Sequence, residues 1–392
     1  MPLNVLYAPD TSDHPNWGCR FMGDWYRRAL TRTGARVSQR VGSRWFYSPS
    51  PGVPDNLTWD LIQQVAAKVR AGTVLQPVAE SLRQCDVLFM NAENFLRPGV
   101  RKGRQLLLLA YLAKHVFGKR CILTNATLDL AEPDLLEIVR EVLPMLDHVH
   151  VREEASLAQI RGLLPASEVA MYPDVAWRFR PQPVSAWGEA AMRPGHLSAW
   201  PDVVEGFDPF QPYITVSASS LYAMPEHAGK DPSPAFAAMV TRLQSLVPQV
   251  VLVASCEVDA SIMRRVVSKT RCSLLGLTLP VPQGADVLAN AALHVGGRWH
   301  PGIFASTGGT PLLALGANTH KMHALVQQMQ PGLPVFDANR IEAELDAIIA
   351  CARQQLAAGA ALRDQLHQRA QAMAASVAGN LGDLDAWVRE AA

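Results

Sequence analysis

The sequence predicts an α/β protein built from two doubly wound domains and a helical C-terminal segment. Three observations lead to this fold class. The chain has 392 residues, which exceeds one typical domain. Short apolar runs alternate with amphipathic segments, and residues 181–210, which contain several prolines and glycines, interrupt that alternation. We expect an N-terminal domain over 1–185, a linker over 186–210, a C-terminal domain over 211–340 and C-terminal helices over 341–392.

In the N-terminal domain, apolar runs of strand length end in polar loops and are followed by segments with helical spacing. Predicted strands cover 4–8, 85–90, 120–124, 148–151 and 169–172, and predicted helices cover 20–30, 60–71, 104–117, 132–143 and 156–164. Residues 41–58 contain an aromatic run and several prolines, and indicate an irregular excursion from the sheet. The alternation predicts a mostly parallel sheet.

The C-terminal domain shows the same alternation of strands and helices. Predicted strands cover 213–217, 250–254, 273–275, 291–295 and 312–315, and predicted helices cover 234–246, 259–267 and a segment that begins at Ile303. Residues 341–389 are rich in alanine and glutamine, so we expect one or two helices that pack back on the domains.

Composition and charge exclude several classes of protein. The 36 basic and 35 acidic residues nearly cancel, which argues against nucleic acid as the main partner. The six cysteines are scattered without a zinc-binding spacing, so we expect reduced thiols. The first residues form a short strand instead of a signal peptide, and no apolar run reaches the ~20 residues that span a bilayer. We therefore expect a cytoplasmic protein.

The segment 293–322 contains basic side chains between glycines and prolines that end strands and helices. Gly296 and Gly297 end an apolar run and allow a sharp turn, Arg298 and His300 follow at once, and Lys321 follows the next predicted strand. Open α/β sheets bind ligands at the carboxyl ends of their strands, so this pattern predicts a site for an anion. In the alternative interpretation, Arg298 pairs with a carboxylate and His300 is an ordinary loop histidine.

Four segments, taken together, resemble the polysaccharide pyruvyl transferase family. They are Asn16-Trp-Gly-Cys19, residues 86–94, residues 151–156 followed by Pro173-Asp174, and Gly297-Arg-Trp-His300 followed by Gly309-Thr-Pro311 and Lys321. The resemblance covers residues 4–325. It implies a GT-B-like architecture, in which two Rossmann-like domains face a cleft.

The resemblance also implies an activity. Similar proteins transfer the enolpyruvyl unit of phosphoenolpyruvate to two hydroxyls of one sugar, which forms a pyruvate ketal and releases phosphate during exopolysaccharide biosynthesis. Phosphoenolpyruvate would be the donor substrate, with no separate cofactor and no metal. The acceptor would be a sugar on a nucleotide or lipid carrier, and a lipid carrier would bring the enzyme into peripheral contact with the inner membrane.

Donor-side residues follow from the same comparison. Arg298 and Lys321 would clamp the carboxylate and phosphate of the donor. His300, favoured in its charged form beside bound phosphate, would act with Arg298 in catalysis as the general acid that protonates the methylene carbon. Further donor-binding residues would be Gly297, Ser217, Ser219 and Asn318, and His294 and His323 are reserve proton donors.

Acceptor-side residues are expected in loops of the N-terminal domain. They are Asn16, Glu93, Asn94, Asn125 and Arg152. Glu93 would accept a sugar proton. The structural alternatives are a carboxylate near a helix N-terminus for Glu93, and for Arg152 an ion pair with Glu153, Glu154 or Asp174.

Departures from the common family pattern keep other functions open. Residues 216–220 lack the arginine that many members carry, so serine hydroxyls would bind the phosphate or the donor would differ. One alternative is a GT-B glycosyltransferase whose Arg298 and Lys321 neutralise the diphosphate of a nucleotide sugar. The other is a non-catalytic sugar-binding member of the fold.

Overall fold

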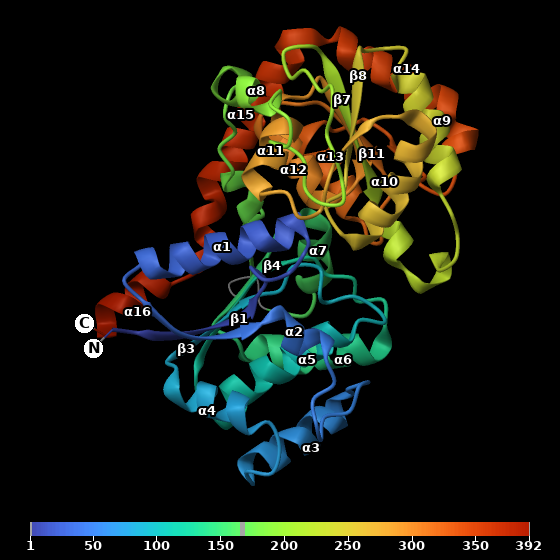
Figure 1. The fold of residues 1–392 in the computed structure, drawn as a ribbon. Coiled ribbons are helices and arrows are strands. Elements are labelled where there is room, and N and C mark those ends of the chain that lie inside the picture. Colours follow the sequence, from blue (N-terminus) through green and yellow to red (C-terminus); the bar gives the residue numbers. More distant parts are fainter. Residues whose placement is uncertain (1, 165–168, 392) are drawn as a thin grey trace. The chain divides into compact units, whose positions relative to one another are not determined.

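The computed structural model describes residues 2–164 and 169–391. The chain divides into two compact units (Figure 1). Unit 1 comprises Met1–His14, Met22–Val175 and Ser376–Ala392, and unit 2 comprises Pro15–Phe21 and Ala176–Ala375. Each unit contains one six-stranded sheet in which every pairing is parallel, which confirms the predicted α/β class.

The sheet of unit 1 has the order β2-β1-β3-β4-β5-β6. Its strands are β1 Asn4–Asp10, β2 Arg36–Gly42, β3 Val87–Asn91, β4 Arg120–Ala126, β5 His148–Val151 and β6 Val169–Met171. The strand order reverses between β1 and β3, and in open α/β sheets ligands bind outside the carboxyl ends of the strands at such a switch point. The interior of β1, β3 and β4 is fully buried.

Helices of unit 1 cover this sheet. They are α1 Trp17–Arg32, whose residues up to Phe21 belong to unit 2, and α2 Ser43–Tyr47, α3 Trp59–Arg70, α4 Gln76–Gln84, α5 Arg101–Tyr111, α6 Pro133–Val142, α7 Glu154–Ile160 and α16 Leu384–Ala391. The expected irregular excursion at 41–58 instead begins with the end of β2 and the short helix α2. β2 is an edge strand of mostly half-exposed polar residues, so it lacks the apolar run by which the other strands are recognised.

The sheet of unit 2 has the order β12-β11-β10-β7-β8-β9. Its strands are β7 Tyr213–Ser219, β8 Gln249–Val253, β9 Ser273–Leu275, β10 Leu293–Gly297, β11 Leu312–Leu315 and β12 Val335–Phe336. From β7 the chain first builds one side of the sheet and then returns to build the other. The switch point therefore lies between β7 and β10.

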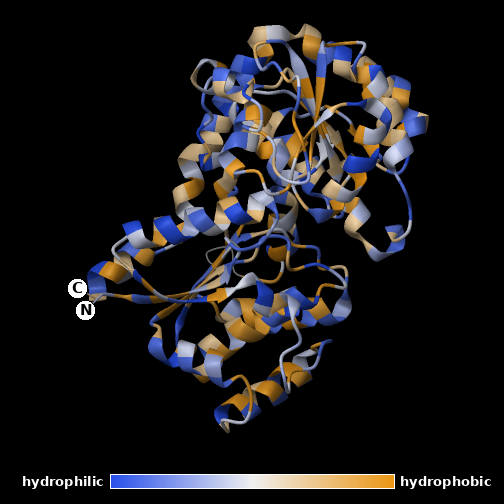
Figure 2. Cartoon of the chain, in the orientation of Figure 1, coloured by the Kyte–Doolittle hydropathy of each residue, from blue (hydrophilic) through white to orange (hydrophobic). Residues whose placement is uncertain are grey.

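Helices of unit 2 include α8, which overlaps the start of the expected linker, and more C-terminal helices follow than expected. They are α8 Val184–Ala191, α9 Ser233–Leu243, α10 Glu257–Thr270, α11 Val281–Asn290, α12 Trp299–Thr307, α13 Lys321–Met329, α14 Ile341–Ala357 and α15 Gly359–Ser376. With α16, three helices follow residue 340, where one or two were expected. α14 places Ile341, Ile348 and Ile349 in the core of the unit. Figure 2 shows the apolar residues gathered along the strands and the inward helix faces.

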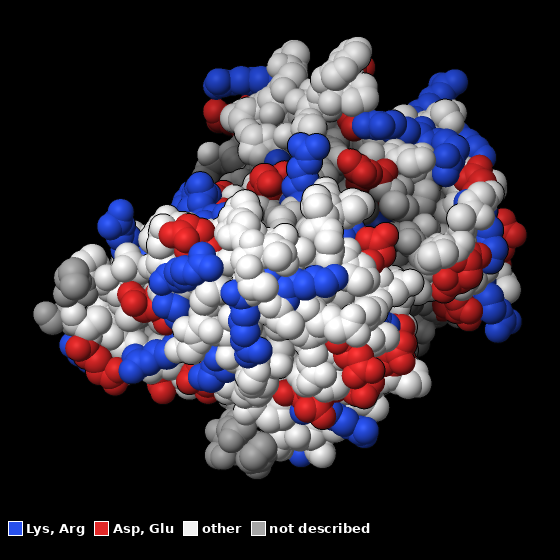
Figure 3. All heavy atoms as spheres, turned by 90° about the horizontal axis from the view of Figure 1, so that it is seen from below, with Lys and Arg blue, Asp and Glu red and all other residues white. Residues whose placement is uncertain are grey.

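Surface and cysteine chemistry are unexceptional. Basic and acidic side chains are both present on the face drawn in Figure 3, where each kind forms small groups. All six cysteines are free thiols, as expected. Within residues 2–164 and 169–391, no helix has the length and apolar character needed to cross a bilayer.

Candidate functional site

The switch point of unit 2 brings together the carboxyl ends of β7, β10 and β11. Gly297 is paired with Ser219 on β7, and the Ser219 hydroxyl donates to the carbonyl of Gly316, which follows β11. A Cβ on Gly297 would lie 2.6 Å from the Ser219 Oγ and 2.8 Å from the Gly316 oxygen. Glycine is therefore the residue that lets the three strand ends close up, and Arg298 leaves the sheet directly from this point.

Arg298 is held by a buried carboxylate. Its Nε and Nη2 both lie 2.8 Å from Oδ1 of Asp259, which is fully buried near the start of α10. Oδ2 of Asp259 accepts from the Ser255 hydroxyl at 2.8 Å and the Ser255 amide at 3.2 Å. Burial alone would lower the pKa of Arg298, but Asp259 and Cys256 raise it above the usual arginine value. The guanidinium is thus charged and fixed in orientation, and the structure contains the carboxylate pairing foreseen as the alternative interpretation.

Lys321 belongs to a second cluster at the same edge of the sheet. Its ammonium donates to Oδ1 of Asn318 at 2.8 Å, and the same oxygen accepts from the Ser220 hydroxyl at 3.0 Å. Lys321 is buried, which is unusual for a lysine. The three residues connect the ends of β7 and β11, so Lys321 and Asn318, both expected to bind the donor, lie together at this edge of the sheet. His323 is exposed on α13.

Two of the expected donor residues have hydroxyls engaged inside the unit. The Ser217 hydroxyl lies 3.4 Å from Nε2 of His294, which is fully buried. Nδ1 of the same histidine lies 2.9 Å from the Thr215 hydroxyl. Burial lowers the pKa of His294 to about 3, so this reserve candidate is neutral at physiological pH and is a poor proton donor. Ser219 is occupied by its bond to Gly316.

His300 lies against the N-terminus of α1. It is the second residue of α12 and is partly exposed. A Cβ on Gly18 would fall 1.9 Å from its Nδ1. Asn16 precedes this glycine, and its Oδ1 accepts from the amides of Gly18 at 2.9 Å and Cys19 at 3.3 Å. Asn16 therefore caps α1 within unit 2, whereas the other four expected acceptor residues lie in unit 1.

The switch point of unit 1 contains Glu93 in a buried polar network. Its Oε1 accepts from the Thr11 hydroxyl at 3.1 Å and from Nδ2 of Asn91 at 3.2 Å, and Oδ1 of Asn91 accepts from Nδ2 of Asn125 at 3.1 Å. Glu93 and Asn125 have φ values of 46° and 60°, a region that residues other than glycine rarely adopt and that is often found at functional sites. The structure thus brings these two residues together, with Asn94 next in the chain.

Arg152 forms a closed network under the same sheet edge. Its Nη1 lies 2.7 Å from Oδ2 of Asp174 and its Nε donates to the Thr127 hydroxyl at 2.8 Å. Glu153 accepts from Thr127 at 3.0 Å and from the Ser156 hydroxyl. Arg152 is 2% exposed. These contacts are the ion pair expected under the structural alternative, and they rigidify the loop after β5.

Sequence reasoning did not single out Asp259, Ser255 or Gly18. An aspartate in the first turn of a helix is common because the helix dipole favours it, so Asp259 carries no functional signal by itself. Gly18 was noted only as part of a segment whose helix was predicted to begin at Arg20, and the partner that requires it is almost 300 residues away. Within the described residues, no group of three or more histidine, cysteine, aspartate or glutamate side chains could hold a metal ion.

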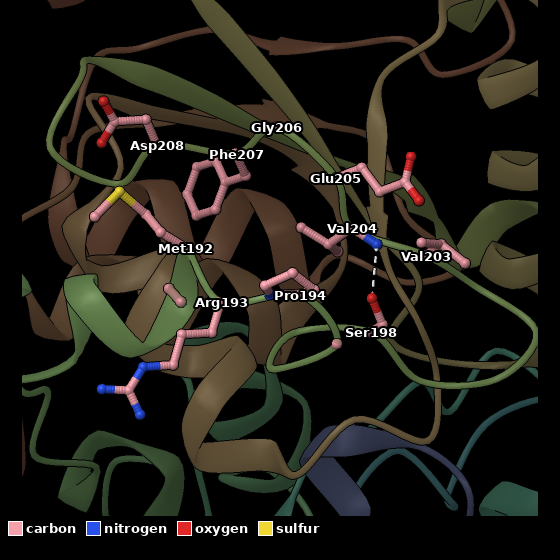
Figure 4. A pocket seen from close by; sticks show the side chains of 12 residues that line it. Met192, Arg193, Pro194, Ser198, Val203, Val204, Glu205, Gly206, Phe207 and Asp208 are labelled. Carbon is pink, nitrogen blue, oxygen red and sulfur yellow. Dashed lines mark hydrogen bonds between the residues drawn. The ribbon is translucent and has the colours of Figure 1, made fainter.

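A cavity of about 690 Å³ lies elsewhere in unit 2 and is lined by residues between Ala191 and Asp208 (Figure 4). Its wall includes Met192, Pro194 and Phe207, and the Val204 amide donates to the Ser198 hydroxyl at 3.0 Å. None of the expected site residues lines it. The chemistry-bearing residues therefore point to the switch points and not to this cavity.

Comparison with known families and structures bears on both the family and the fold. A family model described as polysaccharide pyruvyl transferase matches residues 9–319. No curated protein matches this chain significantly in sequence.

Three solved structures show what the fold is similar to. A putative UDP-N-acetylglucosamine 2-epimerase from Listeria monocytogenes has a TM-score of 0.58 at 12% identity, covering 100% of this chain and 98% of its own. Sucrose-phosphate synthase from Thermosynechococcus elongatus has a TM-score of 0.54 at 14% identity, covering 100% of both chains. UDP-GlcNAc 2-epimerase from Neisseria meningitidis has a TM-score of 0.55 at 10% identity, covering 100% of this chain and 99% of its own. At such identities the likeness shows the fold alone, two Rossmann-like domains of GT-B type.

Proposed function

Since this chain belongs to the polysaccharide pyruvyl transferase family and is therefore a transferase, we propose that its donor is phosphoenolpyruvate and its acceptor a sugar of a cell-surface polysaccharide precursor. The product is a pyruvate ketal bridging two hydroxyls of that sugar, and phosphate is released. The acceptor sugar is attached to a nucleotide or a lipid carrier, and a lipid carrier would bring the cytoplasmic enzyme to the membrane surface.

The observation that carries this proposal is the charged side chains at the switch point of unit 2. Arg298 is charged and held in one orientation by Asp259, and Lys321 is buried at the end of a neighbouring strand. Phosphoenolpyruvate carries a phosphate and a carboxylate, and a fixed planar guanidinium with a compact ammonium suits this pair of anionic groups. We assign the role of general acid to His300, which is the second residue of the helix that begins directly after Arg298.

The proposed reaction starts with proton transfer from His300 to the methylene carbon of the donor, which makes C2 electrophilic. A first sugar hydroxyl then forms a bond to C2, and Glu93 takes its proton. The bond from C2 to the phosphate oxygen breaks, and the second hydroxyl closes the ring as its proton leaves with the phosphate. One hydroxyl proton thus leaves on Glu93 and the other with the phosphate. Glu93 then releases its proton to solvent and His300 takes one up from solvent, so both groups return to their starting forms.

Hydrogen bonds support Glu93 as the acceptor-side base. The Thr11 hydroxyl and the Asn91 amide both donate to its Oε1, which fixes the plane of the carboxylate. A general base must be held within hydrogen-bond reach of the proton that it removes, and a fixed carboxylate meets that need better than a mobile one. Asn125 extends the same network, because its Nδ2 donates to Oδ1 of Asn91 at 3.1 Å.

The test is direct. The full chain is incubated with phosphoenolpyruvate and a panel of nucleotide-linked and lipid-linked sugars, and phosphate release and the mass of a ketal product are measured. In parallel, thermal stabilisation by phosphoenolpyruvate is compared with that by UDP-, GDP- and CMP-sugars. Stabilisation by a nucleotide sugar, with none by phosphoenolpyruvate, would overturn the proposed donor and favour a glycosyltransferase. Binding without turnover of any acceptor would favour a non-catalytic role.

A further inference from the structure

Residues Pro15–Phe21 form part of unit 2, although they lie near the start of the chain. Trp17 is fully buried, its amide donates to the Ser255 carbonyl at 3.0 Å and its indole Nε1 donates to the Leu277 carbonyl at 2.9 Å. Arg20 donates to the same Leu277 carbonyl at 2.8 Å. Two consecutive turns of this segment are thus tied to the loops that follow β8 and β9.

The face of α1 in this segment packs on the face of α12 that carries His300. Phe21 meets Phe304 edge to face, with ring centroids 5.4 Å apart, and Phe304 lies one helical turn after His300. Gly18 lies one turn before Phe21 and opposite the imidazole. A Cβ at this position would lie 1.9 Å from Nδ1 and 2.1 Å from Cγ of His300. Real Cβ atoms do not approach other atoms so closely, so the imidazole occupies the place of the missing side chain.

Backbone conformation gives no other reason for glycine here. Gly18 is the second residue of α1 and is not among the glycines with positive φ. Glycine weakens a helix relative to alanine, so an unconstrained helical position would not favour it. The first amides of α1 are also satisfied, because Trp17 donates to Ser255 and the next two donate to Asn16. They are not a site for an anion.

We infer that Gly18, held in place by Trp17, is a positioning residue for His300, and that the segment 15–21 is a component of the donor site. The segment sets how the imidazole lies relative to Arg298 and to the donor carbon. This inference rests on the proposed function only in treating His300 as the proton donor. The packing itself is independent of that role.

A double-mutant cycle between Gly18→Ala and His300→Ala tests the packing without any substrate. Gly18→Ala should lower the midpoint of thermal unfolding, because the methyl group and the imidazole cannot share the space. In the His300→Ala background the same methyl should lower it much less, because the ring is gone. Gly162→Ala is the matched control, since its Cβ would meet nothing within 4 Å and the residue is exposed. Equal losses in both backgrounds would refute the contact.

Kinetics of the same variants test the positioning. For the ketal-forming reaction, Gly18→Ala should lower kcat about 10- to 100-fold with little change in KM for phosphoenolpyruvate. A displaced His300 transfers its proton less effectively, whereas Arg298 and Lys321 still bind the donor. In the His300→Ala background it should have no further effect on kcat, which a merely structural defect would not predict. If His300→Ala removes turnover while Gly18→Ala leaves kcat unchanged, the positioning role is wrong and the proposed function stands. If His300→Ala leaves turnover intact, the proposed acid is wrong, and the unfolding cycle alone decides the contact.

Discussion

Replacement of Asp259 by asparagine is the most informative single change at the candidate site. The substitution keeps the shape of the side chain but removes the charge that faces Arg298 at 2.8 Å. Asp259 is fully buried and Arg298 nearly so, so the guanidinium is left without a counter-ion in a poorly solvated place. Breaking a buried pair in this way costs about 3–5 kcal/mol. For a unit of this size, that loss lowers the midpoint of thermal unfolding by on the order of 10 °C.

Calorimetry with and without phosphate measures both the loss and its cause. Phosphate or phosphoenolpyruvate should stabilise Asp259→Asn more than the native protein, because the anion replaces the missing negative charge. Asp231→Asn is the matched control, because Asp231 faces Arg265 at 3.0 Å with both side chains about half exposed. Such surface pairs contribute about 0–1 kcal/mol. A midpoint for Asp259→Asn as high as that of the control, or no differential effect of the anion, would refute this account of Arg298.

Three further predictions concern single residues. Burial lowers the pKa of His294 to about 3. Below about pH 6.5 the unfolded chain therefore takes up a proton that the folded protein does not. The free energy of unfolding should fall by about 1.4 kcal/mol for each unit by which the pH is lowered from 6 to 4. His294→Asn should flatten that slope in urea titrations, while the exposed His323→Asn should not. Gly297→Ala should lower the free energy of unfolding by about 1–3 kcal/mol, because the added methyl group overpacks against Ser219. It should also weaken thermal stabilisation by phosphoenolpyruvate. Unchanged urea midpoints would contradict this account. Glu93→Gln should lower kcat by about 10²- to 10⁴-fold and leave thermal stabilisation by phosphoenolpyruvate intact, since the residues proposed to bind the donor lie in unit 2. A large loss of donor binding would contradict its proposed acceptor-side role.

Strands of the interior were readily predicted from the sequence. The run at 312–315 is apolar over its whole length, and the predicted strand at 291–295 is apolar apart from His294. Both are bounded by glycine or proline, as expected for strands buried on both faces. The edge strand β2 carries Arg36, Ser38, Gln39 and Arg40, and it was missed because a half-exposed strand needs no apolar run. The same apolar pattern predicted that Arg298 and Lys321 each follow a strand. Because the carboxyl ends of parallel strands lie at one edge of a sheet, both side chains were expected at the same edge.

Contacts between segments far apart in the chain could not be predicted in the same way. Asn16 was grouped with Glu93 because both follow strands of the N-terminal half, but the segment 15–21 belongs to unit 2 and places Gly18 against His300. Asp259 gave no signal because its partner is 39 residues away and aspartate is ordinary at a helix start.

The sequence by itself thus determined the fold class, the alternation of buried strands with helices, and the kinds of side chain available at the ends of those strands, because these depend on local periodicity and chain direction. Only the tertiary structure decided which carboxylate holds Arg298, which histidine is buried and neutral, and which glycine makes room for His300. These depend on side-chain packing across long sequence separations, where the distance between two atoms bears no relation to their spacing along the chain.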